Sequence, residues 1–203
     1  MRGHRRRART QHETSGTGYS LSGHDNKSWY WEDYDGVPKC ASCGLVNDPL
    51  WINPDFELNR KDMDLSFTHD GQKIVSDRFV TASAGQPGIT FIPLPNHPGH
   101  HLVDVDRTVA FDIEARGTTL SRRCPTCGRF THIAGATPVH LRPGVTLQPG
   151  FSRTDIEFGS SRLNPNLPYQ QHPLILVDPD LGHHLASARL KGLVLKPIKD
   201  PLE

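Results

Sequence analysis

The sequence predicts an α+β or α/β fold, with short mixed sheets and few helices, held together by a four-cysteine zinc site. Three observations predict it. The 203 residues include 18 glycines and 17 prolines, which divide the chain into short elements and many loops. Four cysteines form two Cys-x-x-Cys-Gly pairs that are far apart in the chain. A strand–helix–strand pattern occurs twice, at about residues 72–95 and 172–198.

The N-terminal region predicts a disordered basic tail at residues 1–27, followed by a single domain at residues 28–203. Arginines are frequent in the first nine positions, and a Ser/Thr/Gly-rich stretch follows that has almost nothing to bury. Such an arm can also neutralise nucleic-acid phosphates, which is the alternative to a passive tail.

The first half of the domain predicts four strand-like segments and one helix. Residues 29–31 form an aromatic, strand-like run, and residues 64–71 alternate as a strand that ends in an Asp-Gly turn. A short strand then leads into a helix for which Ser76 is the expected N-cap. The helix ends at Gly88, and residues 89–94 are apolar and β-prone.

The middle of the chain predicts further strands. Residues 102–113 alternate in polarity with an interruption at residues 106–107, which predicts a hairpin. Residues 150–159 predict a strand whose apolar side chains, Ile156 and Phe158, face a core.

The C-terminal region carries the clearest unit. Residues 174–177 form a buried-type strand, and Asp178 followed by Pro179 predicts a capped helix start. Gly192 ends that helix, and residues 193–198 form the next strand. The order strand, capped helix, Gly, strand, Pro also describes the earlier unit. We therefore predict a degenerate internal duplication, with chance similarity of a short pattern as the alternative.

The cysteines predict one structural zinc ion bound by Cys40, Cys43, Cys124 and Cys127. Two residues between the cysteines of a pair let a tight turn direct both sulfurs at one ion, and the following glycine lets the turn continue with positive φ. Two such turns complete a closed four-sulfur shell, so we expect a structural and not a catalytic metal. Disulfides and redox or iron chemistry are the alternatives.

Few other residues predict a site. Arg153 and Asp155 lie in a polar segment that we interpret as part of a partner-binding face, and Trp29 and Trp31 are candidate aromatic anchors of a protein interface. No nucleophile elbow, phosphate loop or dinucleotide fingerprint occurs, so we expect no catalytic activity.

Charge and hydropathy argue against a membrane partner, and against nucleic acid except through the arginine-rich tail. The chain carries 23 basic and 22 acidic residues, so its net charge of +1 gives no general attraction to nucleic acid or membrane. No apolar run approaches the roughly 20 residues that span a bilayer, and no secretory signal is recognisable, so we expect a cytoplasmic protein.

Two Cys-x-x-Cys-Gly pairs separated by a long stretch resemble the double-CxxCG proteins of bacteria, which are thought to be immunity proteins of polymorphic toxin systems. The resemblance covers residues 38–46, 122–130 and 151–198, and excludes the arginine-rich tail. It implies a non-catalytic protein that binds and neutralises a cognate toxin, in the manner of an antitoxin. A zinc-containing nucleic-acid-binding protein and an enzyme with an unrecognised site are the alternatives.

Overall fold

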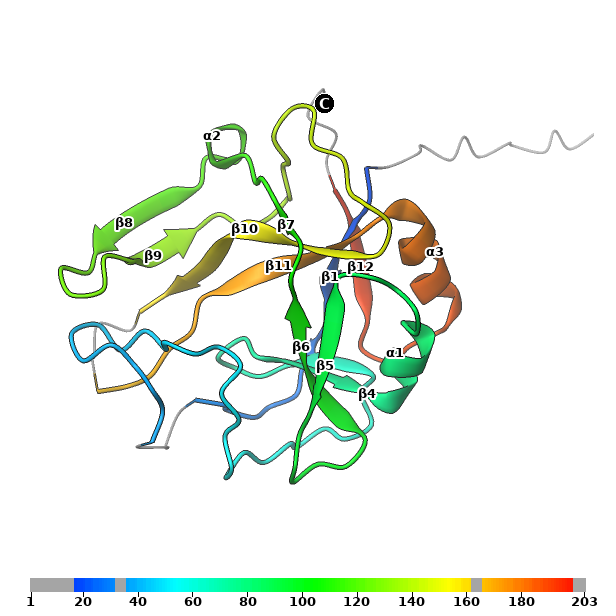
Figure 1. The fold of residues 1–203 in the computed structure, drawn as a ribbon, viewed down its shortest axis with the longest axis horizontal. Coiled ribbons are helices and arrows are strands. Elements are labelled where there is room, and N and C mark those ends of the chain that lie inside the picture. Colours follow the sequence, from blue (N-terminus) through cyan, green and yellow to red (C-terminus); the bar gives the residue numbers. More distant parts are fainter. Residues whose placement is uncertain (1–16, 32–35, 162–165, 199–203) are drawn as a thin grey trace, which may run out of the picture.

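A computed structural model describes residues 17–31, 36–161 and 166–198 (Figure 1). In these residues the protein is a mixed α+β structure with two sheets and three short helices. No helix among them is both long enough and apolar enough to cross a bilayer. Residues 1–16, most of the predicted tail, lie outside the described residues.

The elements follow one another along the chain, with the longest connection between β2 and β3. In order they are β1 (Tyr19–Ser22), β2 (His24–Asp25), β3 (Leu65–Phe67), β4 (Lys73–Ser76), α1 (Asp77–Ala82), β5 (Ile89–Pro93), β6 (His100–Val105), β7 (Thr108–Val109), α2 (Ile113–Arg116), β8 (Thr119–Arg123), β9 (Phe130–Ala134), β10 (Phe151–Ser160), β11 (His172–Val177), α3 (Pro179–Ser187) and β12 (Val194–Pro197).

The strands form two sheets. The first sheet has the order β12-β1-β11-β10-β9-β8, with β7 also paired to β10, and the second has the order β2-β3-β4-β6-β5. Figure 1 shows α1 and α3 together at one end of the molecule, and the β8–β9 hairpin at the other end.

The two sheets share one arrangement. In the first sheet, α3 connects β11 to β12, and both strands are antiparallel to β1, which lies between them. In the second sheet, α1 connects β4 to β5, and both strands are antiparallel to β6 between them. The next strands also correspond, because β7 runs parallel to β10 as β2 runs parallel to β3. The two predicted strand–helix–strand units therefore occupy equivalent positions, while their origin by duplication stays a prediction.

The two halves of the chain, which meet between β5 and β6, exchange their first strands. β1 belongs to the first half but lies in the sheet formed by α3 and its flanking strands, whereas β6 belongs to the second half but lies in the other sheet. Each sheet is thus complete only with a strand from the other half.

The turn after each helix contacts the opposite sheet through its backbone. The Phe151 N–H donates to the Pro87 carbonyl at 2.9 Å, and the Leu65 N–H donates to the Lys191 carbonyl at 3.1 Å. The two bonds are equivalent, because Phe151 is paired with Val177 in the first sheet and Leu65 with Val75 in the second.

Glycine is required at both of these turns. Gly88 and Gly192 have φ values of 84° and 83°. A Cβ atom would lie 2.2 Å from the Phe151 carbonyl oxygen at Gly88, and 2.3 Å from the Leu65 carbonyl oxygen at Gly192. Only a residue without a side chain allows this close approach of backbone to backbone.

One hydrophobic core joins the two sheets and the helices α1 and α3. Its buried members come from both halves of the chain, and they are Leu21, Leu65, Val75, Phe79, Val105, Phe151, Ile175, Val177, Leu181, Leu185 and Leu190. Smaller clusters cover the other faces, one around Tyr30, Trp31 and Phe56, the other around Phe111 and Leu176. The helix starts that join the main core were predicted correctly, since the side chains of Ser76 and Asp178 are the N-caps of α1 and α3.

The predicted boundary of the N-terminal tail at residue 27 is wrong. Residues 19–25 contain β1 and β2, and β1 lies between two strands of the first sheet with Ser20 and Leu21 buried. The Ser/Gly-rich surroundings suggested disorder, but β11 and β12 supply the backbone partners that make this short segment a strand.

The predicted hairpin at residues 102–113 is also wrong. β6 pairs with β4 and β5 in the second sheet, whereas β7 pairs with β10 in the first. The interruption at residues 106–107 therefore marks the passage of the chain from one sheet to the other and is not a hairpin turn.

Candidate metal centre

The four predicted cysteines lie together at the end of the molecule opposite the helices. Their sulfur atoms are all within 4.8 Å of one another and could hold a metal ion. The Sγ atoms of Cys40 and Cys124 are 3.9 Å apart, and those of Cys43 and Cys127 are 3.8 Å apart. Each of these short distances joins the two halves of the chain.

Two tight turns with the same hydrogen bonds direct the sulfurs, and we call residues 40–44 and 124–128 the first and second knuckle. The Gly44 N–H donates to the Cys40 carbonyl at 2.8 Å, and the Gly128 N–H donates to the Cys124 carbonyl at 2.9 Å. The φ values of these glycines are 77° and 73°. Glycine after the second cysteine therefore has the predicted role in both knuckles.

The knuckles also face each other through equivalent residues. The Ser42 and Thr126 hydroxyls, at the third position of each knuckle, are 2.6 Å apart. Together with the two sulfur pairs, this contact joins the first, third and fourth positions of one knuckle to the same positions of the other. The candidate site thus lies at the approximate two-fold axis that relates the two halves.

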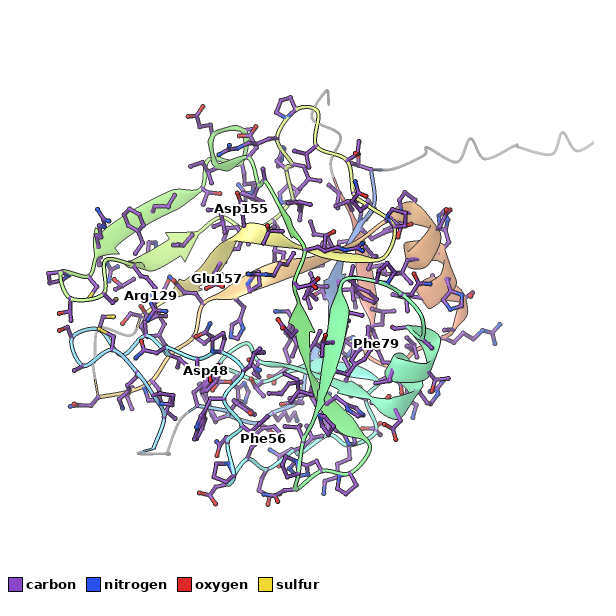
Figure 2. The ribbon with its side chains drawn as sticks, viewed as in Figure 1. Asp48, Phe56, Phe79, Arg129, Asp155 and Glu157 are labelled. Atoms are coloured by element: carbon purple, nitrogen blue, oxygen red, sulfur yellow. The ribbon has the colours of Figure 1, made fainter. Side chains whose placement is uncertain are left out.

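Arg129 joins the second knuckle to the segment after the first. Its guanidinium donates to the carbonyls of Val46 and Leu45 at 2.9 and 3.3 Å, and to the Asn47 side-chain oxygen at 3.1 Å. Figure 2 labels Arg129 beside the sulfurs. This arginine was not selected from the sequence, because its partners lie more than 80 positions away in the chain.

The thiols differ in acidity. Burial raises the pKa of Cys43 to about 12. At Cys127 burial also raises the pKa, but hydrogen bonds from the Arg129 backbone and guanidinium, together with the neighbouring thiols, outweigh it and bring the pKa to about 6. Sulfurs this close to one another can all be ionised only when a cation compensates their charge.

The four cysteines that form the site are partly or fully buried. Cys40 and Cys124 are buried, and Cys43 and Cys127 are half-buried. A pocket of about 220 Å³ adjoins the second knuckle and is lined in part by Arg122, Arg123 and Cys43. Arg123 is held there by a hydrogen bond from its Nε to the Gly128 carbonyl at 2.8 Å, so it stays close to the second knuckle.

Arg153 and Asp155, predicted to share a binding face, have different surroundings. The Arg153 guanidinium lies 3.5 Å from the Glu157 carboxylate. The Asp155 side chain is exposed and accepts a hydrogen bond from the Phe111 N–H at 2.8 Å. Figure 2 labels Asp155 and Glu157 on β10. Their place on a partner-binding face stays a prediction, and the structure adds Glu157, the ionic partner of Arg153, which the sequence analysis did not select.

The two predicted aromatic anchors, Trp29 and Trp31, differ in their exposure to solvent. Trp29 is 38% exposed and is the one large hydrophobic side chain exposed in the part of the chain that the structure describes. Trp31 is 0% exposed, and its ring lies 4.8 Å from that of Tyr30 in the core. The prediction that Trp31 contacts a partner is therefore wrong, because packing of this aromatic run against the second sheet removes it from the surface.

Neither the models of known protein families nor the curated proteins include a match to this chain.

Proposed function

We propose that this chain is a non-catalytic protein that binds another protein, and that one structural zinc ion holds its two halves together. The observation that carries the proposal is the closed cluster of four sulfurs, two from each half. Four sulfurs around a tetrahedral zinc ion, each about 2.3 Å from it, lie about 3.8 Å from one another. The short sulfur pairs at 3.9 and 3.8 Å fit that spacing.

The donor set supports zinc and a structural role. Four thiolates in a tetrahedral arrangement are typical of zinc or iron–sulfur sites, and a mononuclear shell of this size suits zinc. When protein sulfurs fill all four positions, none remains for water or substrate. The metal would then contribute to folding and would not take part in a reaction.

The surface around Trp29 supports binding to a protein. The Trp29 ring lies 4.9 Å from the His69 ring, and a carboxylate oxygen of Asp25 lies 3.1 Å from the His69 Nδ1. A tryptophan held in place beside polar groups is typical of the residues that dominate protein interfaces. With the resemblance of the two knuckles to double-CxxCG immunity proteins, this favours a bacterial immunity protein that neutralises a toxin.

Metal analysis tests the first part of the proposal. We expect about one zinc per chain after dialysis, and we expect Cys40→Ser and Cys127→Ser to lose it and to unfold at markedly lower denaturant concentration, because each removes a ligand from a closed shell. Thr126→Ser, in the same knuckle, is the control and should keep the metal. A chain that stays folded and metal-free with all four cysteines present would contradict the zinc centre.

Co-expression with a candidate toxin from a neighbouring gene of the native host tests the second part. We expect the intact protein to restore growth, and Trp29→Ala to abolish the rescue without changing the melting temperature by more than a few degrees. Glu114→Ala, a change on α2, is the control and should still rescue. Nanomolar binding of nucleic acid by a chain that begins at residue 17 would instead support the zinc-containing nucleic-acid-binding alternative, through Arg122 and Arg123.

A further inference from the structure

A cavity lies between the two sheets, where the main core ends. Its volume is about 120 Å³, and its lining includes Lys73, Val105, Arg153, Glu157, His172 and Ile175. Val105 and Ile175 belong to the main core, so one wall is apolar. The other walls carry charged and polar groups from both halves of the chain.

The position of each charged group follows from strand geometry. Side chains two residues apart on a strand share a face. Lys73 therefore faces the space between the sheets with Val75, and Arg153 faces it with Phe151, since both of these apolar residues are in the main core. On β4 and β10, a lysine and an arginine thus lie on the same strand face as the apolar residues of the main core, next to them.

A β-bulge brings Glu157 closer to Arg153 on the face that the two residues share. Arg153 is paired with Ile175 and Glu157 with Pro173, so three residues of β10 stand opposite one residue of β11. Ile175 and Pro173 are two residues apart and share a face, and their partners on β10 do so too. The Thr154 hydroxyl fills the irregular stretch by accepting from the Leu174 N–H at 3.0 Å. Figure 2 shows Glu157 on β10, near the space between the sheets.

The cations in this cavity are only partly compensated. The Lys73 ammonium donates one hydrogen bond, to the Pro173 carbonyl at 3.2 Å, although an ammonium has three donors. Burial lowers the pKa of Lys73 to about 8, against the opposing effect of Glu157. Arg153 is paired with the same Glu157 carboxylate at 3.5 Å. Among the described charged groups that face this cavity, two cations therefore stand against one carboxylate, and only Arg153 forms an ion pair with it.

The remaining polar groups do not reverse this balance. Burial lowers the pKa of His172 to about 3, so its ring is uncharged at neutral pH. Asp104 also contributes to the lining, but it alternates with Val103 and Val105 on β6, so its carboxylate belongs to the opposite face of the strand. Gln72 is 4% exposed and lines the cavity, and its carboxamide has no hydrogen-bond partner among the described residues. It can act as a further donor.

We propose that this cavity binds a carboxylate group, with Lys73 and Arg153 as the ionic partners and the Gln72 amide as an additional donor. Two cations beside a single internal carboxylate favour one more negative charge. An Arg guanidinium suits a carboxylate because its donors match both oxygens. The volume of about 120 Å³ and the apolar wall at Val105 and Ile175 admit a short aliphatic stem.

The carboxylate has two possible sources with the same chemistry. It can be a free short-chain acid, or it can be a glutamate or aspartate side chain of the bound protein, a source that rests on the proposed function. The following experiment needs no partner protein, so its failure is independent of a failed rescue assay.

The test is an NMR titration of the isotope-labelled, zinc-loaded full chain with propionate. We expect saturable shifts of the Lys73 side-chain signals and a rise in the Lys73 pKa when propionate is bound. Lys73→Met and Arg153→Gln should each weaken binding at least tenfold. The exposed residues Lys61 and Arg142 provide the matched controls Lys61→Met and Arg142→Gln, which should bind as the wild type does.

One variant separates a binding role from a structural one. Glu157→Gln removes the internal carboxylate that competes for both cations, so we expect propionate to bind several-fold more tightly. Absence of saturable shifts in the wild type, or unchanged affinity in both Lys73→Met and Arg153→Gln, would overturn the proposal.

A second probe distinguishes the sources. The α-amide of N-acetylglutamate carries a side-chain carboxylate on a peptide-like backbone. Binding comparable to that of propionate, lost in Lys73→Met, supports the carboxylate site and assigns it to a side chain of a bound protein. Binding of propionate alone supports the site and assigns it to a free short-chain acid.

Discussion

At the scale of single residues, the strictest steric requirement lies where each helix returns to its sheet. Gly192 combines a φ of 83° with a backbone carbonyl oxygen only 2.3 Å from the place of a Cβ atom. Gly85, at the end of α1, has a φ of 74° but no atom within 4 Å of that place. A comparison of substitutions at the two glycines therefore distinguishes the cost of backbone strain from the cost of steric overlap.

We expect Gly192→Ala to lower the free energy of unfolding by about 2–4 kcal/mol, because both strain and overlap act there. Gly85→Ala should cost about 1 kcal/mol, since it adds only the left-handed conformation. Urea unfolding followed by fluorescence measures both. Equal losses in the two variants would show that the turn moves away from Leu65 without cost.

His172 predicts a dependence of stability on pH. Burial lowers its pKa from 6.5 to about 3, so the unfolded chain takes up a proton first as the pH falls. The free energy of unfolding should therefore decrease between about pH 6.5 and pH 3 and gain no dependence from this group above that range.

Replacement by glutamine removes the titrating group. We expect the stability of His172→Gln to fall less steeply on acidification than that of the wild type, when both are measured by urea unfolding at the same zinc concentration. His24→Gln, at an exposed histidine, is the control. Parallel curves for His172→Gln and the wild type would contradict the assignment.

Which residues could be predicted depends on how local their role is. The cysteines were found because the spacing within each pair is a local property, which sequence shows directly. The contacts of Arg129 and the pairing of Arg153 with Glu157 were missed. The first depends on a segment more than 80 residues away, and the second on a bulge that no sequence pattern marks.

At the scale of elements, the two N-terminal strands, β1 and β2, should stabilise the fold. A disordered tail would contribute nothing to its stability. β1 pairs with β12 over four residues and also with β11. Its removal would leave two strands of the first sheet without their common neighbour and expose part of the main core around Leu21.

We expect a chain that begins at residue 28 to melt well below one that begins at residue 17, or to fail to fold, because it lacks β1 and β2. The chain that begins at residue 17 is the control, since it keeps both strands. Circular dichroism on heating provides the measurement. Melting temperatures within a few degrees of each other would show that β11 and β12 need no strand between them.

Elements were predicted well where the signal is contained in a few neighbouring residues. The caps at Ser76 and Asp178 are examples, because a capping side chain bonds the next turn of its own helix. The hairpin at residues 102–113 failed because alternation shows that a segment is a strand but does not identify its partner. The pairing of β6 and β7 with different sheets is a tertiary property.

At the scale of the whole molecule, the equivalence of the halves predicts that the covalent link between them is dispensable. Each half supplies one knuckle and one exchanged strand. The link passes through the turn between β5 and β6, where Pro95 and Asn96 are exposed. A protease recognition sequence inserted between these two residues allows the folded chain to be cut there.

We expect the cut protein to elute at the mass of the intact chain, because the exchanged strands, together with the proposed zinc ion, would hold the pieces together. A zinc chelator should promote separation of the pieces at a denaturant concentration that leaves the zinc-loaded cut protein assembled. Separation in native buffer immediately after cleavage would contradict this prediction.

The exchange of first strands also has a consequence for synthesis on the ribosome. β1 emerges early, but its neighbours β11 and β12 are translated last among the described elements. At 5–20 residues per second, the delay is on the order of ten seconds. For the first part of this interval, until residues 124–127 are translated, Cys40 and Cys43 form a dithiol without its partner pair. The nascent chain thus carries an unpaired strand and two free thiols, which makes it a substrate for chaperones and vulnerable to oxidation before the second knuckle arrives.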